Sequence, residues 1–289
     1  MTTQPALTIA DYKTDEASWW CPGCGDFGVL NALYNALREK GYDPKDVVLV
    51  SGIGCSSRLP FFASTYGFHG VHGRVMPIAT GVKIANPKLH VLALGGDGDA
   101  FAIGGNHFMH AARRNLDVAY VIMDNSIYGL TKGQTSPTSS VGFVTKTTPK
   151  GSPDRAVNPL MFAIASGATF VARGFSGRPK ELAELIVQGI DHNGFAFIDA
   201  YSPCPTFNKV NTFKYYREEV EPVPADHDPT DKMAAIRLAL SEDPLYVGIL
   251  YREEAESFED HIAAMQTGTP AWWRTYSETL PSRMSARGF

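Results

Sequence analysis

The sequence predicts an α/β fold with a doubly wound, mostly parallel sheet, followed by a C-terminal extension. Short apolar runs, typical of strands buried on both faces, alternate along the chain with stretches whose apolar residues recur at helical spacing. In addition, four of the apolar runs lead directly into loops rich in glycine and polar residues, as expected where parallel strands end at a ligand-binding edge.

The expected elements follow from this alternation. Helical periodicity predicts helices at residues 26–39, 76–86, 99–114, 159–167 and 179–191. Gly41 is the expected stop signal after the first of these. The buried apolar runs that predict strands are 47–50, 89–94, 118–123, 168–173 and 195–200. Because helical stretches separate these strands, they form βαβ units and hence a parallel sheet covered on both faces.

Two segments interrupt the pattern. Residues 124–158 are rich in Gly, Ser, Thr and Pro and show no clear element, which is typical of a functional or mobile loop. After residue 204 the chain becomes more polar, with a helix expected at 229–241, a strand at 245–251 and a helix at 257–265. We therefore expect a main domain at 1–210 and an extension at 211–289 packed on it.

Composition excludes several classes of protein. The 289 residues include 26 Lys and Arg against 30 Asp and Glu, a net charge of −4 that argues against nucleic-acid binding. No apolar run reaches the roughly 18–20 residues that span a membrane, and the N-terminus lacks the features of a secretory signal. We expect a cytoplasmic protein, in which four cysteines indicate metal or redox use rather than a disulfide scaffold.

A carboxylate and an amide follow neighbouring predicted strands. Asp97 lies between Gly96 and Gly98 after the run 89–94, and Asn125 follows the run 118–123. Parallel strands lie about 4.8 Å apart, so both side chains can reach one hard cation such as Mg²⁺, and a helix beginning near Asp99 would favour a bound anion. An isolated Gly-Asp-Gly is often only a tight turn, but the pairing with Asn125 favours a metal site.

This Asp–Asn pair resembles the thiamine diphosphate motif, and the predicted sheet is then of the thiamine diphosphate-binding type. The resemblance implies that Asp97, Asn125 and the carbonyl of Ile127 bind Mg²⁺, which bridges the cofactor's diphosphate. A dinucleotide-binding alternative fails because no Gly-x-Gly-x-x-Gly motif opens a helix.

The cysteines leave three hypotheses open. Cys21 and Cys24 form a Cys-x-x-Cys pair, whereas Cys55 and Cys204 each follow a predicted strand. Structural zinc, a redox pair and a [4Fe–4S] cluster all use such thiols, and spacing alone barely separates zinc from the cluster. Thiamine chemistry on a 2-oxoacid favours the cluster, because oxidation in one-electron steps needs a nearby low-potential centre.

Taken together, residues 19–210 resemble the beta subunit of a 2-oxoacid:ferredoxin oxidoreductase. The resemblance rests on six motifs that occur together and in order: WCPGCGDFGVLNAL, GIGCSSR, HGVHGR with ATGVKIANP, GGDGDAFAIGGNHF, DNSIYGLTKGQTSPTS and the late Cys204. Within that family, IYGLTKGQTSPTS is most similar to the 2-oxoglutarate branch.

The resemblance implies cofactors, partners and a reaction. It implies Mg²⁺, thiamine diphosphate and one [4Fe–4S] cluster held by Cys21, Cys24, Cys55 and Cys204. It also implies an alpha subunit with the pyrimidine-binding and CoA-binding domains, in a heterodimer or a dimer of heterodimers. The expected reaction converts 2-oxoglutarate and CoA to succinyl-CoA and CO₂ and reduces ferredoxin. Alternatives are a related enzyme acting on pyruvate or many 2-oxoacids, or a non-catalytic zinc-bearing assembly subunit.

Further site residues come from the same loops. We expect His72 to move a proton or contact phosphate, and Arg58 and Lys132 to bind the distal carboxylate of 2-oxoglutarate. The alternatives are loop packing for the histidine and solvated charges for the two cations. The expected cofactor contacts all lie in glycine-rich or polar loops: Gly54, Ser56, His69, Gly96, Gly98, Asp99, Ile127, Gly129, Leu130 and Thr131.

Overall fold

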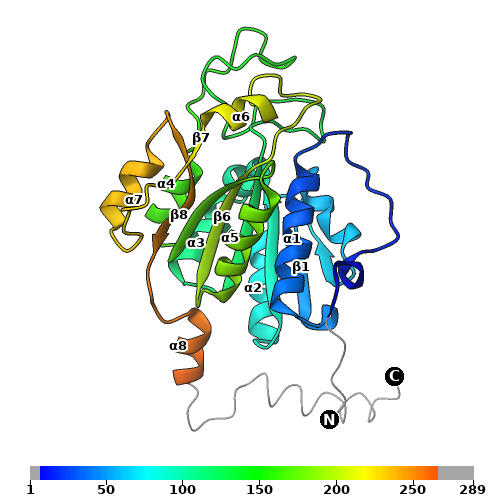
Figure 1. Cartoon of the computed structure of the whole chain (residues 1–289), viewed down its shortest axis with the longest axis vertical. Helices are drawn as coiled ribbons and strands as arrows, with labels where there is room; N and C mark the ends of the chain where they lie inside the picture. Colours follow the sequence, from blue (N-terminus) through cyan, green and yellow to red (C-terminus); the bar gives the residue numbers. More distant parts are fainter. Residues whose placement is uncertain (1–6, 266–289) are drawn as a thin grey trace.

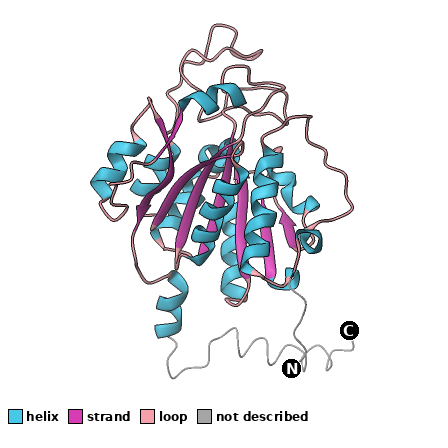
Figure 2. Cartoon of the chain, in the orientation of Figure 1, coloured by secondary structure: helices cyan, strands magenta, loops and turns pink. Residues whose placement is uncertain are grey.

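The computed structural model describes residues 7–265, which form an eight-stranded sheet with helices on both faces (Figures 1 and 2). The strands are β1 (Val47–Ser51), β2 (Tyr66–His69), β3 (His90–Gly96), β4 (Val118–Asp124), β5 (Phe170–Phe175), β6 (Phe195–Tyr201), β7 (Val220–Pro222) and β8 (Leu245–Arg252). The α-helices are α1 (Asp26–Lys40), α2 (Val75–Ala85), α3 (Gly105–Arg113), α4 (Pro159–Ala165), α5 (Pro179–Asp191), α6 (Phe213–Glu219), α7 (Lys232–Ala239) and α8 (Phe258–Met265).

The strands lie in the order β2-β1-β3-β4-β6-β5-β8-β7. The six strands from β1 to β6 all pair in parallel, and β8 adds to β5 in the antiparallel sense. The predicted mostly parallel α/β sheet is confirmed. Within the part assigned to the extension, β8 joins the main sheet directly, and residues 266–289 lie outside the described residues.

Alternating side chains of each strand enter two separate cores. On β1, Val47 and Leu49 pack with α1 and α5, whereas Val48 and Val50 face the core that contains α2, α3, α4 and α7. Figure 1 shows α1 and α5 on the near face of the sheet and α2 and α3 behind it. Burial on both faces explains why these strands are continuous apolar runs in the sequence.

The carboxyl ends of the parallel strands meet at one end of the molecule. The long loop between β4 and α4 and the segment around α6 gather there, at the top of Figure 1. As predicted, residues 125–158 contain no helix or strand, apart from an isolated bridge between Tyr128 and Gln134. This loop therefore covers the edge at which ligands of such sheets bind.

Three features differ from the sequence prediction. The helix expected at 99–114 is interrupted, because Ala102 has non-helical angles and a π-helical turn (Asp99–Ile103) precedes α3. Strand β2 is exposed at the sheet edge along its whole length and so lacks an apolar pattern. Elements α6 and β7 are too short for periodicity to show.

Among residues 7–265, no helix is long and apolar enough to cross a membrane.

His192 should make the folded chain sensitive to mild acid. Its ring is buried, Nε2 lies 2.7 Å from Thr169 Oγ1, and burial lowers its pKa to about 4. A histidine in the unfolded chain titrates near 6.5, so the unfolded state gains a proton first as pH falls. The free energy of unfolding should therefore be highest above about pH 6.5 and should decrease progressively toward pH 4. The decrease should reach about 2 kcal/mol at pH 5.

Urea unfolding of the wild type and His192→Gln at pH 7.5 and pH 5 would measure this contribution. The wild type should lose about 2 kcal/mol more than the variant between the two pH values. Equal losses in both proteins would show that His192 is not the source.

Candidate functional site

A cavity of about 520 Å³ opens at the carboxyl ends of β1, β3 and β4. Its volume lies within the range of ordinary cofactor and substrate sites. It is lined by residues from the three loops after these strands and by one histidine: Ile53, Gly54, Cys55, Ser56, His72, Gly96, Asp97, Gly98, Asp99, Asn125, Ile127, Tyr128, Gly129, Leu130, Thr131 and Gln134. Most of the residues predicted to contact a cofactor therefore lie around one cavity.

Two buried carboxylates contact one hydroxyl beside the cavity; Asp97 lines the cavity, whereas Asp124 lies behind it and does not. Thr138 Oγ1 is 2.8 Å from Asp97 Oδ2 and also 2.8 Å from Asp124 Oδ1. A hydroxyl carries one proton and can donate it to only one of these acids. Burial raises the pKa of both carboxyls, and the charge of Asp124 raises that of Asp97 further. A cation bound at Asp97 would offset this negative charge, so the residues present fit Mg²⁺.

The other two predicted magnesium ligands are held close by. Asn125 Oδ1 accepts a hydrogen bond from Ile127 N at 3.1 Å, and the Asn125 carbonyl accepts one from Asn208 Nδ2 at 2.9 Å. These bonds fix the turn that brings Asn125 and Ile127 to the cavity wall. Asp97, Asn125 and Ile127 together offer a carboxylate, an amide and a carbonyl oxygen, all of which suit Mg²⁺.

The four cysteines come from three separate segments. Cys21 and Cys24 precede α1, Cys55 follows β1, and Cys204 follows β6. Gly25 allows the first segment to approach the last, because Gly25 N donates to Pro203 O at 3.0 Å. A Cβ at Gly25 would lie 2.6 Å from the carbonyl carbon of Ser202, so only glycine permits this approach.

Cys55 connects the cysteines to the cavity. Trp20 Nε1 donates to the Cys55 carbonyl at 2.7 Å, and a Cβ at Gly129 would lie 3.4 Å from Cys55 Sγ and 3.7 Å from Cys204 Sγ. Burial raises the pKa of Cys55 to about 12, with Asp26 adding to the effect, so the free thiol keeps its proton at neutral pH. Burial likewise raises the pKa of Cys24 far above its usual range. Cys24 lies near enough to Cys55 and Cys204 for their charges to raise its pKa, and each cysteine of a [4Fe–4S] cluster binds a different iron. Among residues 7–265, no three His, Cys, Asp or Glu side chains converge as the ligands of a single metal ion would.

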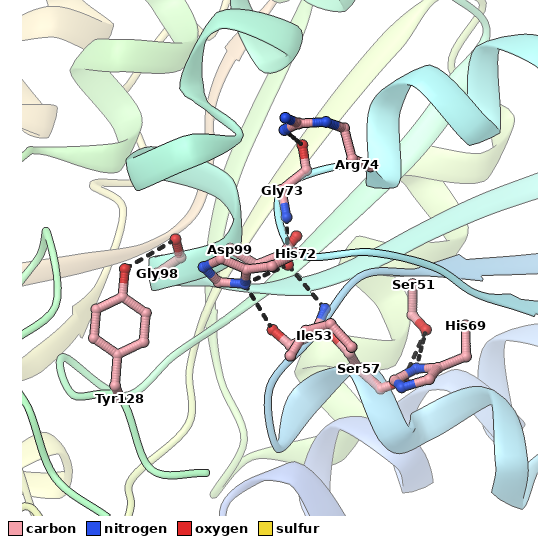
Figure 3. Close-up of polar contacts among 10 residues, drawn as sticks. All are labelled: Ser51, Ile53, Ser57, His69, His72, Gly73, Arg74, Gly98, Asp99 and Tyr128. Carbon is pink, nitrogen blue, oxygen red and sulfur yellow. Dashed lines mark hydrogen bonds and ion pairs between the residues drawn. The ribbon is translucent and has the colours of Figure 1, made fainter. Parts of the chain in front are cut away.

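His72 and Asp99 form a hydrogen-bonded pair beside the cavity (Figure 3). Asp99 Oδ1 lies 3.0 Å from His72 Nδ1 and accepts hydrogen bonds of 2.9 Å from Ile53 N and Gly73 N. Burial raises the pKa of Asp99, while the two backbone donors and His72 oppose this shift. The predicted cofactor contact Asp99 thus lines the cavity with its carboxylate engaged by the neighbouring loops.

Besides Cys21, Cys24 and Cys204, three predicted site residues do not line the cavity. The ring of His69 is turned away, with Nδ1 2.9 Å from Ser57 O and 3.2 Å from Ser51 Oγ (Figure 3). Arg58 Nη1 donates to Trp19 O at 3.3 Å, and Lys132 is exposed with a positive φ of 76°. Their predicted roles remain predictions.

Tyr128 and Gln134 line the cavity but were not singled out from the sequence. The Tyr128 hydroxyl donates to Gly98 O at 3.3 Å, and its ring lies so close that a Cβ at Gly98 would be 2.2 Å from Tyr128 Cε1. Both residues belong to the motif DNSIYGLTKGQTSPTS. Membership of that motif was the signal that could have identified them.

The chain is similar to known proteins in sequence and in overall structure. Residues 52–200 match the family described as "Thiamine pyrophosphate enzyme, C-terminal TPP binding domain", and residues 204–267 match the family of the C-terminal part of the pyruvate ferredoxin oxidoreductase beta subunit. The chain is 43% identical over 276 residues to subunit beta of 2-oxoacid:ferredoxin oxidoreductase 2 from Aeropyrum pernix, covering 91% of this chain and 89% of the relative. The chain belongs to the family of 2-oxoacid:ferredoxin oxidoreductase beta subunits.

Two further relatives agree with this assignment. The 2-oxoglutarate synthase subunit KorB of Methanocaldococcus jannaschii is 43% identical over 224 residues, which is 78% of this chain and 80% of the relative. A solved 2-oxoglutarate:ferredoxin oxidoreductase from Magnetococcus marinus, with 2-oxoglutarate, coenzyme A and succinyl-CoA bound, superposes with a TM-score of 0.90 at 46% identity, covering 92% of each chain. The family predicted from the motifs is confirmed, and the matched thiamine diphosphate domain contains every residue that lines the cavity.

Gly98→Ala should weaken thiamine diphosphate binding by roughly tenfold, because the added methyl group would displace the Tyr128 ring that forms the cavity wall. Calorimetric titration of the chain with the cofactor in the presence of Mg²⁺ measures the change. Gly81→Ala is the control, since a Cβ there has nothing within 4 Å. Unchanged affinity in a folded Gly98→Ala protein would contradict this account of the cavity wall.

Proposed function

We propose that this chain carries the thiamine diphosphate and the iron–sulfur cluster of a CoA-acylating 2-oxoglutarate:ferredoxin oxidoreductase. The reaction is 2-oxoglutarate + CoA + 2 oxidised ferredoxin → succinyl-CoA + CO₂ + 2 reduced ferredoxin + H⁺. The observation that carries this proposal is that Asp97, Asn125 and Cys55 line one cavity. A metal–diphosphate site and a thiol of the cluster set therefore share one space.

Asp97, Asn125 and the carbonyl of Ile127 would hold Mg²⁺, and through it the diphosphate. When bound, thiamine diphosphate supplies the nucleophilic carbon and the electron sink for decarboxylation. Thr138 positions Asp97 through the 2.8 Å contact of its Oγ1 with Asp97 Oδ2, and the Tyr128 ring closes the adjacent wall. Leu130 and Ile53 add apolar surface to the cavity, which helps to exclude water from the reacting carbon.

Cys21, Cys24, Cys55 and Cys204 would hold one [4Fe–4S] cluster, which accepts single electrons when bound. The half-buried thiols of Cys24 and Cys55 have raised pKa values, and a metal bound to sulfur would take the place of the proton. Cys55 belongs both to the cavity wall and to this set, so electrons would travel a short path. Free thiols suit a reducing compartment, and we propose the cytoplasm.

An alpha subunit should complete the site. We propose that it supplies the glutamate that activates the cofactor and the CoA-binding domain, in a heterodimer or a dimer of heterodimers. Aromatic side chains that are exposed in the isolated chain gather around the sheet edge at β2, and this supports a surface that the alpha subunit covers. Trp19, Phe61, Tyr66 and Phe68 are 40–62% exposed. Large apolar groups at this density are typical of surfaces that bind a partner.

The chain co-expressed with its alpha subunit should reduce ferredoxin when given 2-oxoglutarate and CoA, whereas the chain alone should show no turnover. Anaerobic absorbance of the reduced acceptor measures the rate, and thiamine, iron and sulfide analysis gives the cofactor content. A complex that contains zinc without iron, or that reduces no acceptor with any 2-oxoacid, would overturn the proposal.

Arg58 and Lys132 remain candidates for contact with the distal carboxylate of 2-oxoglutarate. Loss of such a contact should lower kcat/KM for 2-oxoglutarate by roughly 30- to 150-fold and leave pyruvate turnover nearly unchanged. Kinetics of Arg58→Ala and Lys132→Ala with both substrates would test this. An unaltered ratio in both variants would place the selectivity in the alpha subunit.

Gly25→Ala should lower the iron content of the purified chain. The new Cβ would lie 2.6 Å from the Ser202 carbonyl carbon and 2.7 Å from Pro203 N, and this backbone must then move away with Cys204. Iron per chain is the readout, and Gly81→Ala again serves as the matched control. Full iron content in Gly25→Ala would mean that this close approach is not needed to assemble the cluster.

A further inference from the structure

The position of the proton on the His72 ring follows from its neighbours. Nδ1 lies 3.0 Å from Asp99 Oδ1 and 3.3 Å from the Ile53 carbonyl oxygen. Both neighbours are acceptors, so Nδ1 carries the hydrogen and Nε2 of the neutral ring has a free lone pair. Figure 3 shows Nε2 directed away from Ile53, toward the side on which Tyr128 lies. His72 lines the cavity, so this lone pair is available to a bound substrate.

Asp99 is held rigidly for this contact. Its Oδ1 accepts hydrogen bonds of 2.9 Å from the backbone N–H groups of Ile53 and Gly73, which belong to two different loops. A Cβ at Gly52 would lie 2.3 Å from the same oxygen, so glycine is required where the loop passes the carboxylate. A carboxylate fixed in this way orients the imidazole and stabilises it when a second proton is added.

The reaction under the proposed function needs a proton acceptor. The thiol R′SH and the 2-oxoacid RCOCOO⁻ give the thioester RCO–SR′, CO₂, two electrons and one H⁺. The electrons pass to ferredoxin, whereas the proton leaves sulfur as the C–S bond forms. A base within reach of the reacting carbon would accept that proton during bond formation.

The other candidate groups of the cavity are engaged or shielded. Asp97 is in contact with Thr138 and is the expected metal ligand. Asp99 Oδ1 is occupied by three donors, and Asp99 Oδ2 has no hydrogen-bond partner but is buried away from solvent. Cys55 belongs to the cluster set, and the Tyr128 hydroxyl donates to Gly98 O. Among the described histidines, His72 alone lines this cavity.

We propose that His72 Nε2 accepts the proton of the CoA thiol, and that Asp99 is the positioning residue that fixes the ring for this transfer. The S–H bond breaks as N–H forms, and the imidazolium later releases the proton to solvent. This proposal rests on the proposed function, because it assumes a thiol substrate at the cavity.

Anaerobic single-turnover kinetics of the holoenzyme separate the two halves of the reaction. In His72→Gln the CoA-dependent step should fall by roughly 100-fold or more relative to the CoA-independent reduction of the cluster by 2-oxoglutarate, measured in the same variant. His261→Gln, an exposed histidine on α8, is the matched control. An unchanged CoA-dependent step in His72→Gln would overturn the inference while leaving the proposed function intact. Absence of any CoA-dependent turnover in the wild type would instead overturn the proposed function.

The positioning role of Asp99 is tested by variants that separate it from a purely structural role. Asp99→Ala should slow the CoA-dependent step, and Asp99→Asn should retain much of the rate because the amide oxygen can still accept a hydrogen bond from His72 Nδ1–H. The double variant Asp99→Ala with His72→Gln should be no slower than His72→Gln alone, since the carboxylate acts through the ring. Additive losses would show that Asp99 only supports the loops.

Nuclear magnetic resonance of the full chain with ¹⁵N-labelled histidine rings tests the geometry without turnover. His72 should show protonated Nδ1 and unprotonated Nε2 in the neutral ring, and Asp99→Ala should mix the two tautomers. A wild-type ring with its proton on Nε2 would overturn the inference.

Discussion

The hydroxyl of Thr138 lies between two buried carboxylates, and the arrangement of the cavity depends on this contact. Asp97 and Asp124 are close because they end neighbouring parallel strands, and two negative charges so close in a buried site destabilise the fold unless they are compensated. The contact also returns the long loop to the sheet edge, where Ser139 Oγ donates to Ser126 O at 2.7 Å. The loop between β4 and α4 is thereby held over the cavity that it helps to line.

The negative charge of Asp124 is partly offset by Arg173, which lies on β5. Arg173 is buried, donates from Nε to Asp199 Oδ2 at 2.8 Å, and lies near enough to Asp124 for each to shift the pKa of the other. The positive charge of Arg173 thus acts on both Asp199 and Asp124. Burial raises the pKa of Asp199 to about 7. No comparable cation lines the cavity on the Asp97 side among the described residues, which is consistent with a metal ion as the partner of that carboxylate.

Sequence patterns predicted the sheet because each central strand is apolar on both faces, and they predicted the cavity because its loops are glycine-rich motifs. They missed β2, whose four residues are all exposed, and the break at Ala102 within the helix expected at 99–114. Proximity in sequence to a motif did not determine where a side chain points. Arg58 lies three residues after Cys55 but donates to Trp19 O, and Asp124 and Thr138 meet only because of the path of a loop that has no periodicity.

The loop after β1 couples the two halves of the proposed chemistry. Its Ile53 N–H holds Asp99, its Cys55 thiol belongs to the proposed cluster set, and Trp20 fixes the Cys55 carbonyl from the segment that carries Cys21 and Cys24. A displacement of this short loop would therefore move the proposed proton acceptor and a proposed cluster ligand together. Gly52 contributes to the same coupling, because any side chain there would collide with the Asp99 carboxylate. The loop is thus constrained by both proposed sites at once, since Ile53, Gly54, Cys55 and Ser56 all line the cavity while Gly52 passes the Asp99 carboxylate.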